Sequence, residues 1–309
     1  KGKELVIDQG ARVYFHQNSG IIVQDESTIT INGRLSTDVE LLENEVIFEG
    51  DRLEPEFEDI TGQWGTIWIS AGSKNNAINH LTIKNAEIGL FVEGQENEAE
   101  ETLTITNSRI FNSATYNLWT KNANVIATNI ILGGAGNSSL SIENGGRYLF
   151  THATIANYWN KGFRFNASLV ISNSSITDSN TGFDLLAADF KNCIFDGNSS
   201  NEILLQSNSQ NSFNFSFQNC YIKFNENQSS TENNIFYDFE SDVHYPNVIL
   251  NGELDYFKPF DNDFRIGLDS EVINKGDLNT ANSAPLDIIE TTRIPNPDLG
   301  AYQAIEKEF

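Results

Sequence analysis

Asparagine recurs through the middle of this chain at a nearly constant spacing, inside a repeated stretch of strand-like sequence. The seven positions, one of them a histidine, lie 22, 22, 23, 21, 19 and 27 residues apart: Asn85, Asn107, Asn129, His152, Asn173, Asn192 and Asn219. In the clearest copy, Leu103 and Ile105 precede Asn107. A fixed period of about 22 residues is typical of a solenoid, in which one structural unit stacks on the next.

Within each repeat, apolar and polar residues alternate over a few positions, as at Leu81 and Ile83 or at Phe215 and Phe217. This period of two is typical of a strand with one buried face. Most repeats carry a second short run of the same kind, and none carries a run with the 3.6-residue period of a helix. We therefore expect an all-β chain folded as a right-handed parallel β-helix.

The repeats are most regular over residues 79–224, and strand-like sequence extends them back to the start of the chain. Beyond about residue 225 the period fails. We expect residues 1–236 to form the coils and residues 237–309 to form an irregular closing segment. Such a segment would cover the exposed end, because an open coil end presents unpaired strand edges.

The leucine-rich repeat is the competing interpretation, since it has a similar period and its own asparagine. In a leucine-rich repeat the asparagine follows the last strand leucine by three residues, and a helical or 3₁₀ segment then leads back to the next strand. Here the gap from Ile105 to Asn107 is two residues, and the return segments are rich in Asn, Ser and Gly. The motif favours the β-helix.

A physical reason exists for stacked asparagines in such a fold. Neighbouring strands lie about 4.8 Å apart, so an aligned amide can donate to one neighbour and accept from the other. We expect the seven residues at equivalent inward positions. His152 is expected to continue the row through its ring nitrogens rather than to act in catalysis.

The composition is strongly acidic, with 43 Asp and Glu against 19 Lys and Arg and a net charge of −24. This argues against nucleic acid and anionic membranes as partners, since both need basic patches. No apolar run is long enough to span a membrane. The chain opens directly in strand-like sequence and contains no methionine, so we expect a trimmed piece of a longer precursor.

The two cysteines occupy the same slot in adjacent repeats. Cys193 follows Asn192, and Cys220 follows Asn219. Their Cα atoms are expected about 5 Å apart, inside disulfide range. Stacked thiols remain the alternative, and they are favoured because parallel neighbours in register point the same way.

Several motifs resemble surface lipoproteins of Bacteroidetes that form right-handed parallel β-helices. The motifs that carry the resemblance are residues 10–16 (GARVYFH), 48–54 (FEGDRLE), 62–68 (GQWGTIW) and 154–159 (TIANYW). The end of the chain, residues 269–276 (DSEVINKG) and 297–302 (PDLGAY), resembles the closing motif of many bacterial β-helix proteins, from which it departs at Glu271 (proline in the motif) and Asn274 (aspartate in the motif). The resemblance implies an exported protein, anchored to the outer membrane or cell surface through a lipid on a missing N-terminal part. It supplies no catalytic residue.

In a β-helix, function depends on outward side chains that stack across coils. The alternation predicts one such stripe, formed by Trp119, Ser141, Arg164 and Asp184 in consecutive repeats. Lys121 and Glu143 are expected side by side next to this stripe. An aromatic ring with charged neighbours suits a sugar. Cross-coil ion pairs on a solvated sheet, including Arg164 with Asp184, are the structural alternative.

A second cluster is unusually basic and aromatic for so acidic a chain: Arg147, Tyr158, Trp159, Asn160 and Lys161. Tyr158, Trp159 and Lys161 are candidate contacts for a glycan or a partner protein. The alternative is that Trp159 folds back over the corner of the coil.

A non-catalytic binding protein is the favoured function, with a glycan or another envelope protein as the partner. The alternative is a lyase or glycoside hydrolase acting on an acidic polysaccharide, with Arg164 and Asp184 as the catalytic pair. Asp178 and Asp196 form a weaker carboxylate pair. The four histidines show no metal-ligand spacing, so no cofactor is expected, although the acidic surface permits Ca²⁺. Outward Thr106, Thr128 and Thr151 suggest a third possibility, ice binding.

Overall fold

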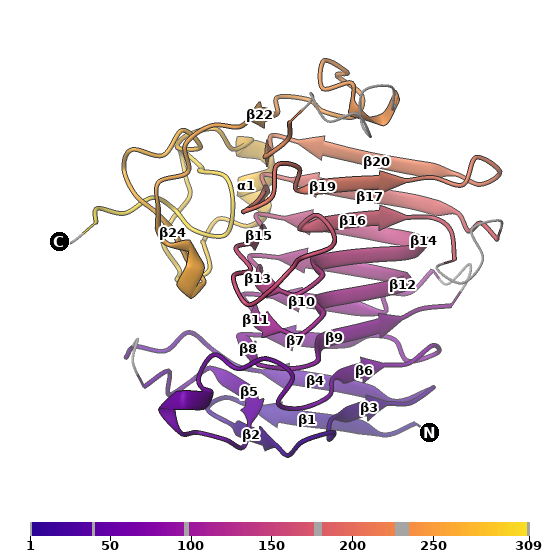
Figure 1. Ribbon diagram of the computed structural model, residues 1–309, viewed down its shortest axis with the longest axis vertical. Helices are drawn as coiled ribbons and strands as arrows, with labels where there is room; N and C mark the ends of the chain where they lie inside the picture. The colour runs from indigo at the N-terminus through magenta and orange to yellow at the C-terminus, as the bar shows by residue number, and fades with distance from the viewer. Residues whose placement is uncertain (1, 39–40, 96–98, 176–180, 226–234, 308–309) are drawn as a thin grey trace.

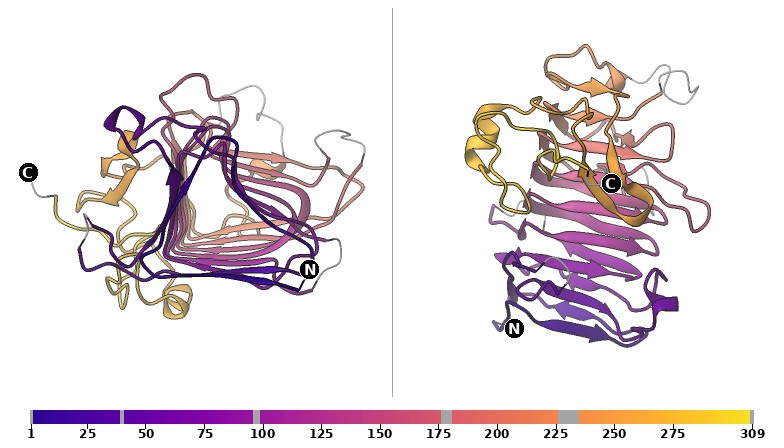
Figure 2. Two further views of the ribbon diagram at one scale, coloured as in Figure 1. Left: turned by 90° about the horizontal axis from the view of Figure 1, so that it is seen from below. Right: turned by 90° about the vertical axis from the view of Figure 1, so that its left-hand side faces the viewer.

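The computed structural model describes residues 2–38, 41–95, 99–175, 181–225 and 235–307, and it is a parallel β-helix. Seen along its axis, the coils outline a triangle, and the last part of the chain lies outside that triangle (Figure 2). The predicted fold class is confirmed. Among the described residues, no helix is long and apolar enough to cross a membrane.

One side of the triangle is a parallel sheet of nine strands, here called the nine-stranded sheet (Figure 1). Its strands, in spatial order, are β2 (Arg12–Phe15), β5 (Val46–Gly50), β8 (Leu81–Lys84), β11 (Arg109–Ser113), β13 (Ile131–Ala135), β15 (Thr154–Asn157), β18 (Ile194–Gly197), β21 (Tyr221–Ile222) and β22 (Ile249–Leu250).

The other two sides are joined into one parallel sheet of thirteen strands. One run comprises β1 (Glu4–Asp8), β4 (Thr28–Asn32), β7 (Asn76–Asn79), β10 (Leu103–Thr106), β17 (Leu185–Lys191) and β20 (Phe213–Gln218). The other comprises β3 (Ile21–Val23), β6 (Ile67–Ile69), β9 (Ile88–Glu93), β16 (Leu169–Ser172) and β19 (Ile203–Gln206). Two long strands, β12 (Tyr116–Thr128) and β14 (Ser138–Thr151), pass through both sides.

Inward side chains of successive coils stack in rows and form one continuous core. Phe190 stacks between Phe150 and Phe217, with ring centroids 5.2 and 5.0 Å away, and Tyr245 follows Phe217 at 5.5 Å. These spacings are close to the distance between neighbouring strands, because each ring repeats its position one coil further along. The two-residue alternation in the sequence therefore marks the core directly.

The asparagine row lies at the corner between the thirteen-stranded and the nine-stranded sheets. Six residues share this corner, with φ from 47° to 55°: His80, Asn107, Asn129, His152, Asn192 and Asn219. Asparagine tolerates this left-handed conformation better than most residues, so the turn itself favours it. Side-chain bonds add to this, from Asn107 to Asn79, from Asn129 to Asn107, both 3.0 Å, and from Asn192 to His152 at 3.1 Å.

Two of the seven expected members do not belong to this row. Asn85 ends β8, one strand later than the corner, and His80 takes its place. Asn173 follows β16, on the far side of the coil. The same apolar alternation occurs on every side of the triangle, so a Leu-x-Ile-x-Asn sequence alone does not reveal which corner follows it.

The expected inward position of the row is also wrong. The amide of Asn129 donates to the Leu286 carbonyl at 2.9 Å, and the amide of Asn192 donates to the Asp277 carbonyl at 3.1 Å. Asn129 and Asn192 therefore face outward, and the end of the chain covers them.

The closing segment divides into two parts with different roles. Phe239 and Tyr245 pack on Phe224 and Phe217 at the end of the coils. Residues 251–307, here called the C-terminal segment, instead run back along the outside of the nine-stranded sheet (Figure 1). This segment contains β23 (Tyr256–Lys258), β24 (Asp263–Ile266) and the short helix α1 (Leu278–Ser283).

Glycine makes close contact between the C-terminal segment and the sheet possible. A Cβ atom on Gly133 in β13 would lie 2.5 Å from the Phe264 ring. Phe264 packs with Ile131 and Ala156 in a small core of its own. Part of the outer face of the nine-stranded sheet is therefore buried under the C-terminal segment.

Cys193 and Cys220 are both buried and unbridged. They directly precede the adjacent strands β18 and β21, in which Ile194 pairs with Tyr221. Each thiol donates to a backbone carbonyl of the preceding coil, Phe150 for Cys193 and Phe190 for Cys220.

Candidate functional site

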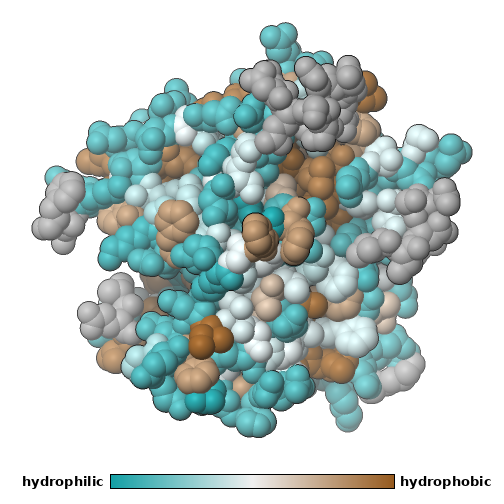
Figure 3. Space-filling view, in the orientation of Figure 1, coloured by the Kyte–Doolittle hydropathy of each residue, from teal (hydrophilic) through white to brown (hydrophobic). Residues whose placement is uncertain are grey.

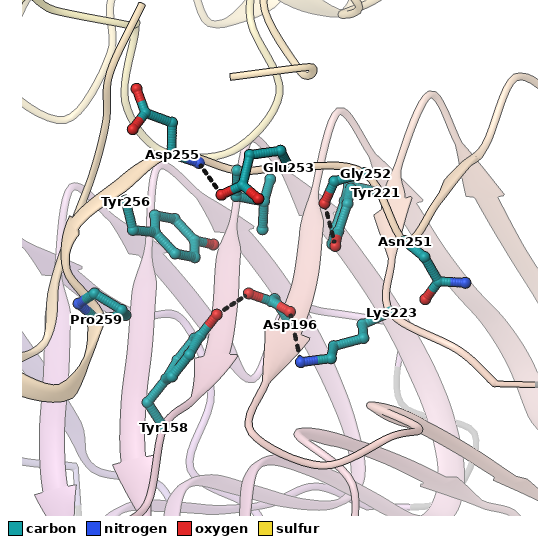
Figure 4. Close-up of a pocket in the computed structure, with 11 residues that line it drawn as sticks. Tyr158, Asp196, Tyr221, Lys223, Asn251, Gly252, Glu253, Asp255, Tyr256 and Pro259 are labelled. Atoms are coloured by element: carbon teal, nitrogen blue, oxygen red, sulfur yellow. Dashed lines mark hydrogen bonds and ion pairs between the residues drawn. The ribbon is translucent and has the colours of Figure 1, made fainter. Parts of the chain in front are cut away.

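A pocket lies where the C-terminal segment meets the outer face of the nine-stranded sheet (Figure 4). Its volume is about 360 Å³. The floor is formed by outward side chains that follow or belong to β15, β18 and β21: Tyr158, Asp196, Tyr221 and Lys223. The rim comes from residues 251–256 and Pro259. We call it the Asp196 pocket.

Asp196 is outward because β18 alternates, with Phe195 directed into the core. The Tyr158 hydroxyl donates to its Oδ2 at 2.5 Å, and the Lys223 Nζ lies 3.9 Å from its Oδ1. Burial raises the pKa of the Asp196 carboxyl above its ordinary value, although Tyr158 and Lys223 act in the opposite direction. Burial also raises the pKa of Tyr158, so this hydroxyl keeps its proton.

The rim adds further polar groups. The Tyr221 hydroxyl donates to the Gly252 carbonyl at 2.9 Å, which holds the rim over the sheet. Glu253 is exposed at the entrance, whereas Asp255 is paired with Lys307 at 2.5 Å. The Glu253 carboxylate at the mouth accepts a bond of 3.3 Å from the Asp255 backbone N–H.

The Tyr256 hydroxyl is buried and finds no hydrogen-bond partner among the described residues. It points into the pocket toward Asp196 and Tyr158 (Figure 4). A buried polar group without a partner costs about 1–3 kcal/mol, so such a group is usually satisfied by water or by a ligand. This hydroxyl marks the pocket as a candidate site for a polar molecule.

The pocket combines a carboxyl, an ammonium, amide and hydroxyl groups with three tyrosine rings. Such a set can both donate to and accept from a molecule that carries several hydroxyl groups. Within the part of the chain that the structure describes, no three His, Cys, Asp or Glu side chains are arranged to hold a metal ion.

The binding residues expected from the sequence lie in different places. Tyr158 lines the Asp196 pocket. Trp159 is half-buried and packs its ring near Gly136, at the corner of the coil. The Lys161 ammonium donates to the backbone carbonyl of Asp59, in the acidic loop that precedes β6.

Arg164 and Asp184 are not a pair, and the catalytic hypothesis based on them is wrong. The Arg164 side chain is 4% exposed and forms an ion pair with Glu202 at 2.5 Å. Asp184 accepts from the Ser212 backbone N–H at 2.8 Å, in another part of the coil. The error arises because residues 158–168 form a loop, so the next strand on this side begins at Leu169, not at Phe163. Asp178, the other expected partner of Asp196, lies outside the described residues.

Trp119 belongs to a row of stacked rings on the outer face of β6, β9 and β12. Its ring centroid lies 4.5 Å from that of Phe91, which in turn lies 5.8 Å from that of Trp68. The Lys121 ammonium lies 4.2 Å from the centre of the Trp119 ring. The faces of these rings are thus occupied by neighbouring side chains of the protein, and mainly their edges face outward. The structure therefore gives Trp119 a stacking role across coils.

Sequence reasoning found Tyr158 and, as a weak candidate, Asp196. It missed Lys223, Tyr221 and the whole rim. Phe195 and Ile222 face the core, so the residues that follow them, Asp196 and Lys223, face outward. Because β18 and β21 are neighbours, the sequence pattern could have predicted that these two side chains lie side by side. The repeat pattern could not have predicted that Glu253 and Tyr256 line the pocket, because both residues belong to the irregular C-terminal segment.

Comparisons with known proteins yield one distant structural match. No family model matches this chain, and no curated protein sequence matches it. Among solved structures, the chain is similar to pectate lyase Pel9A, with 12% identity and a TM-score of 0.34 over 98% of this chain and 88% of that one.

Proposed function

We propose that this β-helix is an exported surface protein that binds carbohydrate in the Asp196 pocket. The observation that carries the proposal is the buried, unpartnered Tyr256 hydroxyl directed at the Tyr158–Asp196 bond. A sugar hydroxyl can donate to one of these groups while it accepts from another. The tyrosine rings that line the cavity suit the apolar face of a pyranose.

The proposed location outside the cell is based on the resemblance of the first coils and of residues 154–159 to Bacteroidetes surface lipoproteins. The acidic surface, with a net charge of −24, is compatible with exposure to solvent. Protease treatment of intact cells that express the full-length protein tests this location. Loss of the protein supports the proposal, and full protection contradicts it.

Glycoside hydrolysis is a second candidate function, favoured by one observation. Burial raises the pKa of Asp196, as a general acid requires, and Glu253 offers a second carboxylate at the pocket mouth. Against this, the Tyr158 hydroxyl already donates to Asp196, and Glu253 is exposed. We therefore favour binding without cleavage.

A panel of neutral and acidic oligosaccharides distinguishes the two functions. Each sugar is titrated by calorimetry and also incubated with the protein, followed by an assay for newly formed reducing or unsaturated ends. Saturable binding without new ends supports the binding proposal. New ends that disappear in Asp196→Asn support hydrolysis, and the absence of both binding and cleavage contradicts both.

A further inference from the structure

Two phenylalanine side chains project from the loop between β15 and β16 into solvent. Phe163 is 91% exposed and Phe165 is 84% exposed, the highest values among the phenylalanines of the described residues. The space-filling view shows apolar side chains projecting near the centre of the face seen in Figure 1 (Figure 3). Exposed aromatic pairs of this kind are costly to solubility and often mark interaction sites.

The loop is fixed, so the exposure of these rings is a feature of its geometry. Arg164 stands between the two phenylalanines and points inward to Glu202, which is completely buried and also accepts from Ser168 at 2.7 Å. The Asn166 amide donates to Asn137 at 2.7 Å. The alternation thus buries a charged residue and exposes its two apolar neighbours, the reverse of ordinary folding preference.

An acidic loop lies beside this one. Lys161 binds the Asp59 carbonyl and joins the phenylalanine loop to residues 51–60. That segment exposes five carboxylates, Asp51, Glu54, Glu56, Glu58 and Asp59, together with two large apolar side chains, Leu53 at 60% and Ile60 at 46%. We call residues 51–60 with Phe163 and Phe165 the Phe163 surface.

The chemistry of the Phe163 surface separates the possible partners. A sugar needs hydrogen-bonding groups beside the rings, but Lys161, Arg164 and Asn166 on this loop are engaged within the protein. An anionic lipid surface would be repelled by the adjoining carboxylates. Apolar anchors next to a block of negative charge are complementary to a basic polypeptide that carries apolar side chains.

We propose that the Phe163 surface docks a protein segment rich in Lys or Arg with interspersed large apolar residues. The two phenylalanines supply the anchors, and residues 51–59 supply the charge. This surface is separate from the Asp196 pocket, because none of its residues lines that cavity. The two proposals can therefore fail independently.

The test uses two synthetic peptides of equal length and charge, one alternating Lys with Leu and Trp, the other alternating Lys with Ser. Binding to the full chain is followed by fluorescence anisotropy at physiological salt. The apolar peptide is expected to bind at least tenfold more tightly than the serine peptide. Phe163→Ser with Phe165→Ser should remove that difference, and Glu54→Lys with Glu56→Lys should weaken both peptides.

The matched control removes two exposed apolar side chains elsewhere, Val243→Ser with Leu268→Ser, which are 76% and 60% exposed. It should bind both peptides as the parent chain does. Equal affinity for the two peptides, or equal loss in the control, would overturn the proposal. So would phenylalanine-dependent binding to phosphatidylcholine vesicles without peptide binding, which would identify a lipid surface instead. Circular dichroism melting confirms that each variant is folded.

Discussion

The stacked coils and the C-terminal segment are held together in different ways. In the coils each residue repeats the environment of its counterpart one coil away, so rows such as Phe150, Phe190 and Phe217 form a continuous core. The C-terminal segment has no repeat and is fixed by individual contacts to the corner row and to the outer face of the nine-stranded sheet. The Asp196 pocket lies at the junction, where a regular floor meets an irregular rim.

The strongest test of this difference is removal of Arg293. This side chain is 1% exposed and donates to Asn129 and to the Ala301 carbonyl, and burial lowers its pKa to about 10. Arg293→Ala leaves the buried Asp287 and Asp298 without their nearby cation, at a cost of about 3–5 kcal/mol. We expect the C-terminal segment to lose protection in hydrogen exchange while the coils keep theirs.

Arg265→Ala is the matched control, since this arginine of the same segment is 42% exposed, pairs with nearby Asp263 and lies over the Phe257 ring at 4.5 Å. Its cost should not exceed about 1 kcal/mol. Simultaneous loss of protection in coils and segment after Arg293→Ala would show that the two regions form one cooperative unit.

A smaller effect is expected at Asn129, where the two regions meet. Its amide donates to Asn107 and to the Leu286 carbonyl, and its Oδ1 accepts from Arg293. Asn129→Leu should lower the free energy of unfolding by about 1–3 kcal/mol, because buried partners are left unsatisfied. Urea denaturation measures this change. Asn129→Gly keeps the left-handed backbone accessible, so the difference between the two variants isolates the backbone contribution.

The smallest effect concerns His152, which accepts from Asn192 at 3.1 Å in the corner row. Burial and nearby Arg293 hold its pKa well below the ordinary value of 6.5. The unfolded chain therefore binds the extra proton first, and stability is lost as pH falls below about 6.5. His152→Asn should show a weaker loss between pH 7.5 and pH 5 in urea midpoints. Parallel curves for both proteins would mean that His152 does not titrate on unfolding.

The fold could be predicted from the sequence because every coil needs apolar side chains at the same inward positions. Leu103 and Ile105 are apolar for the same reason as Tyr148 and Phe150, since all four face one core. The repeat pattern does not show which corner of the coil follows a given strand. For this reason the prediction that Asn85 and Asn173 belong to the corner row is wrong. The loop before β16 caused the related error at Arg164.

The candidate site could be predicted only in part, for a physical reason. Asp196 lies on β18 and Tyr158 directly follows β15, so their outward direction could be expected from the alternation of these strands. Tyr256 and Glu253 reach the pocket because the C-terminal segment folds back along the nine-stranded sheet. That path depends on contacts between residues more than 100 positions apart, such as Asn129 with Leu286, which no local pattern reveals.

The central claim is that a ligand satisfies the Tyr256 hydroxyl where the coil and the C-terminal segment meet. The most direct measurement is calorimetric titration of the best-binding sugar into the parent chain, Tyr256→Phe and Tyr14→Phe. Tyr14 is a 48% exposed tyrosine on β2, away from the pocket, and serves as the matched control. We predict about tenfold weaker binding for Tyr256→Phe, which corresponds to one lost hydrogen bond of about 1.4 kcal/mol, and unchanged binding for Tyr14→Phe. Equal affinity in all three proteins would contradict the account.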